Sequence, residues 1–199
     1  ATAAPGAPLA DKLRRLLGFY QACLSPTQVR LLSVVALFRT PVAEATVLRI
    51  ARGLFGQDAE APLPADSALR TTLARLHSDG VLTREPMADG AGYAAHPVLR
   101  DHFRGVLIGS GAAGRAADLL SGAPSDDRPR TLAAVEPVLL AIDLLQAAGD
   151  FRAADALYRG RLENGKLLKW IAAPQAKRAV ARGFVGDAGR QARCADLLG

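Results

Sequence analysis

The three histidines are the side chains of this sequence best suited to bind a metal or to contact an anion. His77, His96 and His102 include no pair at the i, i+4 spacing that places two ligands on one helix face. We therefore predict no metal site. His96 differs from the others because it lies where an expected strand leads into a helix that begins at Pro97. Helix N-termini bind phosphate, so His96 is a candidate phosphate contact.

The segment Gly109–Gly114 spells G-x-G-x-x-G, a pattern that binds dinucleotides when a strand precedes it and a helix follows. A helix is expected before this segment instead. Arg115 and Ala116 also stand where a P-loop requires Lys and Ser or Thr. We therefore interpret the glycines as a linker between domains.

Groups that could form a catalytic set are also lacking in the sequence. Ser78-Asp79 and the run 125–127 have the composition of turns, and neither cysteine has a histidine near it in sequence. We predict that the chain is not an enzyme and holds no cofactor of its own.

Two further groups could contact a partner. A helix expected over 67–79 carries Arg70, Arg75 and His77, which could enter a DNA major groove or contact a protein. Trp170 is the only tryptophan and has Lys166, Lys169 and Lys177 around it, so it could anchor a partner protein. The alternatives are the more common roles of these residue types. The charged residues would lie on a solvated helix face, and the tryptophan would lie in the core.

Composition indicates a mainly helical protein. Half of the 199 residues are hydrophobic but only 5% are aromatic, and Ala, Leu and Arg dominate, which favours packed helices over a β-sandwich. The net charge of +6 comes from arginines scattered between Arg14 and Arg193 rather than from a basic run. Nucleic acid is therefore the less favoured partner.

The two cysteines, Cys23 and Cys194, lie near opposite ends and form no metal-binding or disulfide pattern. A reduced cytoplasmic location is expected. The sequence has no apolar run of 18 residues, so we expect no membrane insertion. The start of the chain, 1–8, is rich in small residues, Pro and Gly, and we expect it to be a linker within a longer protein.

The first half of the chain predicts helices followed by one β-hairpin. A capping box at Ser25–Gln28 is a strong signal for the start of a helix. Thr40-Pro41 repeats the pattern of a capping residue followed by Pro, and Ser67 could cap another helix. Strands are expected at 81–85 and 93–96, joined by a tip at 86–92. The expected helices are 9–24, from Pro26 onward, from Pro41 to about 54, 67–79 and 97–108. Helices followed by a two-stranded wing predict a winged helix.

The second half predicts helices only. A short helix over 115–120 and a polar loop lead to a long helix over 131–148, which Gly149-Asp150 separates from a partner helix over 151–162. Such a pair forms an antiparallel helical hairpin, a unit that solenoids repeat, but no second copy follows at a fixed spacing of about 34 residues. Helices are also expected over 166–185, with a break at Pro174, and over 189–198. The predicted divisions are a linker 1–8, a winged-helix domain 9–108, a connection 109–130 and a helical-hairpin region 131–199.

The residues from Leu76 to Phe103, L-H-S-D-G-V-L-T-R-E followed by Y-A-A-H-P-V-L-R-D-H-F, resemble the winged helix of bacterial STAND NTPases. These are NLR-like, NB-ARC-type signalling ATPases. Glu136-Pro137, A-I-D-L-L-Q-A-A-G-D-F-R-A-A-D-A-L-Y-R-G-R-L and K-L-L-K-W-I-A-A resemble the helical stretch that leads into tetratricopeptide-like repeats in that class. The resemblance covers about 24–184.

The resemblance implies a regulatory role. His96 aligns with the histidine of the Met-His-Asp motif, which holds the diphosphate of ADP in the resting state, although Ala95 and Pro97 replace its neighbours. The nucleotide-binding domain, with ADP or ATP and Mg²⁺, would lie upstream and be a partner of this chain. Bacterial signal transduction or antiviral defence, a trigger protein bound by the repeats, and a homo-oligomer formed on activation are implied as well.

Two other functions are compatible with the sequence. One is a DNA-binding transcriptional regulator that uses the helix with Arg70, Arg75 and His77, and whose C-terminal helices sense a ligand. The other is a helical adaptor that binds a partner protein. Fold alone does not decide between these functions and signal relay.

Overall fold

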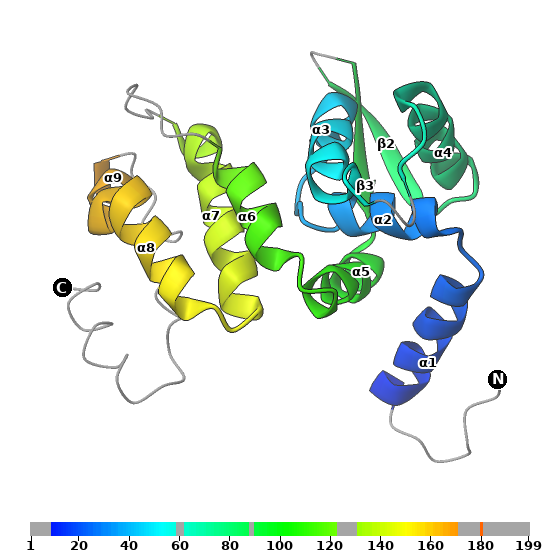
Figure 1. Cartoon of the computed structure of the whole chain (residues 1–199), viewed down its shortest axis with the longest axis horizontal. Coiled ribbons are helices and arrows are strands. Elements are labelled where there is room, and N and C mark those ends of the chain that lie inside the picture. Colours follow the sequence, from blue (N-terminus) through cyan, green and yellow to red (C-terminus); the bar gives the residue numbers. More distant parts are fainter. Residues whose placement is uncertain (1–8, 59–61, 88–89, 123–130, 171–179, 181–199) are drawn as a thin grey trace. The chain divides into compact units, whose positions relative to one another are not determined.

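The computed structural model describes residues 9–58, 62–87, 90–122, 131–170 and 180 (Figure 1). Contacts divide the chain into two compact units, Ala1–Ser110 and Gly111–Gly199. The division falls inside the glycine-rich segment Gly109–Gly114. Helices dominate both units, and the first also holds a three-stranded antiparallel sheet. The predicted mainly helical fold is confirmed at this level.

The first unit opens with α1 (Leu9–Ala22) and α2 (Pro26–Val35). The predicted capping box is present: the Ser25 hydroxyl accepts from the Gln28 N–H at 3.3 Å, and the Gln28 side chain accepts from the Ser25 N–H at 2.8 Å. Pro26 occupies the first turn, where a missing N–H costs nothing. The cap thus starts α2 where the sequence predicts.

The start of the next helix differs from the prediction. Val42 and Ala43 form a short strand, β1 (Val42–Ala43), and α3 (Glu44–Phe55) begins only after it. Thr40 is therefore not a helix cap. Val42 is buried and pairs with Tyr93 across the sheet, so tertiary strand pairing overrides the local cap signal.

The helix α4 (Asp66–Ser78) starts one residue before the predicted cap. Ala65 occupies the cap position, and no side chain caps the helix there. Asp66 lies in the first turn, where a carboxylate is favoured, and pairs with Arg52 of α3 at 2.9 Å. This long-range ion pair replaces the predicted Ser67 cap.

The sheet has the strand order β1-β3-β2, with β2 (Leu82–Met87) and β3 (Gly90–Ala95) forming an antiparallel hairpin. Its register runs from Leu82 opposite Ala95 to Met87 opposite Gly90, so both strands are longer than predicted. Pro86 is accommodated because β2 is an edge strand. The helix α5 (Pro97–Gly109) follows directly and buries Phe103 and Leu107.

The second unit consists of helices in its described part. The longest, α7 (Leu132–Ala147), packs against α6 (Ala113–Ser121) and against α8 (Phe151–Leu162). As predicted, Gly149 with φ +80° and the cap Asp150 separate α7 from α8. A 3₁₀ turn (Glu163–Gly165) and α9 (Lys166–Trp170) complete it. The predicted helix over 189–198 and the break at Pro174 lie outside the described residues.

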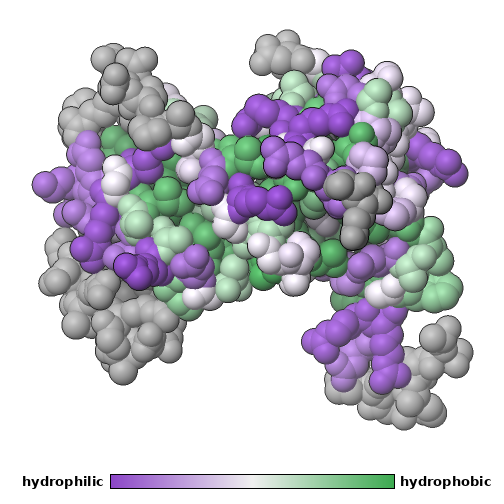
Figure 2. Space-filling view, in the orientation of Figure 1, coloured by the Kyte–Doolittle hydropathy of each residue, from purple (hydrophilic) through white to green (hydrophobic). Residues whose placement is uncertain are grey.

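The surface of the described residues carries few large apolar side chains. Those exposed are Leu13, Leu16, Phe19, Met87 and Leu132. In the part of the chain that is described, no helix combines the length and apolar character needed to cross a bilayer. Figure 2 shows polar side chains over much of the visible face.

Replacing Leu73 tests the packing of α4. Leu73 is fully buried, so Leu73→Ala should lower the free energy of unfolding of the first unit by about 2–5 kcal/mol, measured by urea denaturation. Thr71→Ala, on the exposed face of the same helix, is the control and should change it by about 0.5 kcal/mol or less. Equal effects of the two variants would contradict the packing described.

Candidate functional site

His96 lies at the N-terminus of α5, at the junction between β3 and the helix. Its backbone occupies the cap position, and its side-chain Nδ1 accepts a hydrogen bond from the Val98 N–H at 3.3 Å. The imidazole is exposed to solvent. The side chain of His96 therefore serves as the N-cap of α5, the helix that begins at Pro97.

This capping bond determines which nitrogen of His96 can donate. Because Nδ1 accepts a hydrogen bond from the Val98 N–H, a neutral ring carries its own proton on Nε2. Nε2 is then a hydrogen-bond donor on an exposed ring at a helix N-terminus, where anions are favoured. One donor at a helix end can contact a phosphate but does not form a complete nucleotide site.

The three predicted contact residues of α4 have partners within the first unit. Arg70 Nε lies 2.9 Å from the Glu44 carboxylate of α3, and Arg75 Nε lies 3.8 Å from Asp79. His77 Nδ1 lies 3.1 Å from the carbonyl oxygen of Leu82, so Nδ1 must be the donor. These side chains connect α4 to its neighbours or to its own last turn.

Glu44 is a centre of polar contacts that sequence reasoning did not single out. Its second carboxylate oxygen accepts from the Tyr93 hydroxyl at 3.4 Å, while the first binds Arg70. Burial, followed by the negative charge of Glu44, raises the pKa of Tyr93 above its usual value of 10. Glu44 thereby joins α3, α4 and β3.

Trp170 is the last residue of α9. Its side chain lies outside the described residues, as does Lys177, whereas Lys166 and Lys169 share the same short helix. Its predicted role as a partner anchor stays a prediction.

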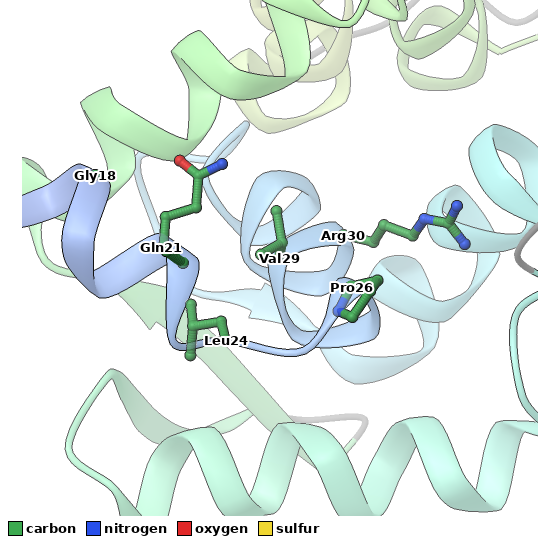
Figure 3. A pocket seen from close by; sticks show the side chains of 7 residues that line it. Gly18, Gln21, Leu24, Pro26, Val29 and Arg30 are labelled. Atoms are coloured by element: carbon green, nitrogen blue, oxygen red, sulfur yellow. The ribbon is translucent and has the colours of Figure 1, made fainter.

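A cavity of about 440 Å³ lies between α1 and the start of α2 (Figure 3). Figure 3 shows Val29 on α2 beside it and the Arg30 side chain directed away from α1. Arg30 pairs with Asp58 and lies over the Phe55 ring, 5.2 Å from its centre. The Gln21 amide oxygen forms a hydrogen bond with Nε2 of His102 at 2.8 Å. The polar side chains that line this cavity, Arg30 and Gln21, therefore already have partners within the first unit.

A second cavity, of about 430 Å³, lies between the α1–α2 junction and α4. Its lining includes Tyr20 of α1, Cys23 of the junction, and Arg75 and Asp79 at the end of α4. Burial and the nearby Asp79 charge raise the pKa of Tyr20. More than fifty positions separate Tyr20 from Arg75, so no local sequence signal could have predicted their proximity. His96 lines neither cavity.

The described residues bring no three His, Cys, Asp or Glu side chains together in a geometry that could hold a metal ion. Comparison of the chain with models of protein families, with curated proteins and with solved structures finds no match. Residue geometry and the sequence resemblance are therefore the basis for assigning a function.

His102 should make the stability of the first unit depend on pH. Burial lowers its pKa below 6.5, so the unfolded chain takes up the proton first as the pH falls. This contribution to stability is fully present above pH 6.5 and is lost as the pH falls through the lowered value. Between pH 7.5 and 5.5, urea denaturation should therefore show a larger loss for the wild type than for His102→Gln. Equal losses would contradict the assignment.

Proposed function

We propose that this chain is the regulatory segment of a bacterial STAND-type signalling ATPase. The first unit is then a winged-helix domain in which α2, α3 and α4 precede the wing β2–β3. The second unit begins a set of tetratricopeptide-like hairpins, of which α7 and α8 form one. The order of elements supports this proposal, because helices, hairpin and a further helix follow one another within 9–109.

The observation that carries the proposal is the position of His96. It caps α5 through Nδ1, which leaves Nε2–H as an outward donor at a helix N-terminus. In the proposed protein, a nucleotide-binding domain upstream holds ADP or ATP with Mg²⁺. His96 donates to the diphosphate of ADP and so connects the winged helix to the resting state of that domain.

This connection provides a mechanism for restraint. A ligand shifts an equilibrium only if it binds one conformation better than another. A hydrogen bond from His96 to ADP exists only while the first unit lies against the nucleotide domain, so bound ADP favours that arrangement. Binding of a trigger protein to the helical hairpins would then favour release of the first unit from the nucleotide domain.

The alternative of a DNA-binding regulator has less support from the geometry. Its recognition helix would be α4, yet Arg70 and Arg75 are paired with Glu44 and Asp79. To contact a base or a phosphate, each exposed arginine would have to exchange its carboxylate, at a cost of about 1 kcal/mol or less. A helical adaptor without a nucleotide domain stays the third hypothesis, and it assigns no role to His96.

Replacing His96 in the protein that includes its preceding region tests the proposal. His96→Ser retains a capping side chain but is too short to reach the phosphate. Loss of a hydrogen bond to a charged group is worth about 1.5–3 kcal/mol, so the ADP affinity measured by calorimetry should fall by about 10- to 150-fold.

Asp101→Ala is the matched control, because Asp101 is an exposed residue on the same helix. It should leave ADP affinity unchanged. Unchanged affinity in His96→Ser would refute the role of His96. A preceding region that lacks the phosphate-binding pattern G-x-x-x-x-G-K-[ST] would refute the whole proposal.

A further inference from the structure

The connection between α8 and α9 has an unusual backbone. Glu163 has φ 49° and ψ 48°, and Asn164 has φ 54° and ψ 35°. They are the only non-glycine residues with a positive φ in the described part of the chain, and Gly165 follows with φ 79°. We call Glu163–Gly165 the left-handed turn. Only glycine adopts this conformation without steric cost, so Glu163 and, to a smaller extent, Asn164 are strained.

The positions of the apolar residues explain why the chain turns here. The buried side of α8 carries Ala154, Tyr158 and Leu162, which lie four positions apart. If the helix continued without a break, Lys169 would lie about 20° from Tyr158 around the axis and would face the core. Leu167 would lie on the opposite side, about 180° from Tyr158. An unbroken helix would therefore place a charge inside and a leucine outside.

The left-handed turn reverses this arrangement. Leu167 and Leu168 have exposed fractions of only 1% and 0%, whereas Lys166 and Lys169 are exposed. Helix α9 contacts α8 (Figure 1), and Gly165 within the turn is buried as well. Burial of the two leucines stabilises this arrangement and holds α9 in place against the strain of the turn.

We propose that α9 is a strap that opens from α8 when the left-handed turn relaxes. In the closed form Leu167 and Leu168 are buried, and the backbone of Glu163 and Asn164 is left-handed. In the open form the two leucines are exposed, and both strained residues return to the right-handed or extended conformations that L-amino acids prefer. The opening takes place within the second unit and does not depend on the proposed nucleotide function.

The strain of the turn affects how often the strap opens. Left-handed backbone at one ordinary L-residue lowers the population of the conformation that contains it by about 5- to 30-fold. Only the closed form contains this backbone, so the strain at Glu163 shifts the equilibrium toward the open form by about that factor. Burial of Leu167 and Leu168 opposes the shift and keeps the closed form the major one.

Opening of α9 should be a local event. It exposes Leu167 and Leu168, whereas unfolding of the α7–α8 hairpin exposes seven buried residues of α7 and three of α8. Segments that few apolar contacts hold in place open at the lowest free energy. The amide hydrogens of α9 should therefore exchange with solvent when the strap alone opens, and those of α8 only when the hairpin unfolds.

Hydrogen exchange of the full chain, followed by mass spectrometry, tests the proposal with pairs of variants. Glu163→Gly and Glu163→Ala remove the same side chain, but only glycine adopts the left-handed conformation without strain. Exchange of the α9 amides should be about fivefold slower, or slower still, in Glu163→Gly than in Glu163→Ala. The pair Asn164→Gly and Asn164→Ala should differ in the same direction.

Ala156→Gly is the matched control, because Ala156 is an exposed residue within the right-handed helix α8. Glycine there should speed the exchange of the α8 amides instead of slowing it. In the wild type, α9 should exchange faster than α8. Exchange of α9 in Glu163→Gly that is as fast as in Glu163→Ala, or faster, would overturn the proposal, because no strain would then be released on opening. Equal protection of α9 and α8 in the wild type would overturn it too, since α9 would then open only with the whole hairpin.

Discussion

The first unit depends on the second half of α2, which is buried on every side. The run from Leu31 to Leu37, which covers the second half of α2 and the two residues after it, is fully buried. Ser33 is its only polar side chain. A helix that is apolar all round must be covered all round, and α3, α4, α5 and β3 all contact it. Removal of this surface from water is the main driving force for assembling the unit.

The coverage of α2 places the functional candidates. The α5 helix turns Phe103 and Leu107 inward, and its first residues, with His96 as cap, remain at the surface. The α4 helix buries Leu69, Leu73 and Leu76, which leaves its arginines to meet carboxylates outside the core. One packing constraint thus accounts for the exposed histidine and for the position of the paired arginines outside the core.

Local signals in the sequence predict some of the helix starts, and the predicted caps at Thr40 and Ser67 are wrong. The Ser25–Gln28 capping box and the Gly149-Asp150 break act within four residues, so the same residues that form the signal form the structure. The Thr40-Pro41 signal is equally local but misleads, because Val42 is buried and pairs with Tyr93, 51 positions along the chain.

The candidate site is predictable only where one residue carries it. His96 could be selected from its place before Pro97 at a strand–helix junction. The partners of Arg70 and Arg75 could not be predicted together: Asp79 is one helical turn from Arg75, but Glu44 reaches Arg70 from another helix. The cavity between Tyr20 and Arg75 depends likewise on the packing of distant helices. Sequence therefore predicts which side chains are available, and packing decides which are engaged.

The proposed regulatory role requires that His96 donates a hydrogen bond from Nε2 to a phosphate. The most direct measurement is a structure of the ADP-bound protein that includes the region preceding this chain. The account predicts that Nδ1 still accepts from the Val98 N–H and that Nε2 lies about 2.7–3.2 Å from a diphosphate oxygen. A His96 ring that caps α5 but points to solvent while ADP is bound would contradict it.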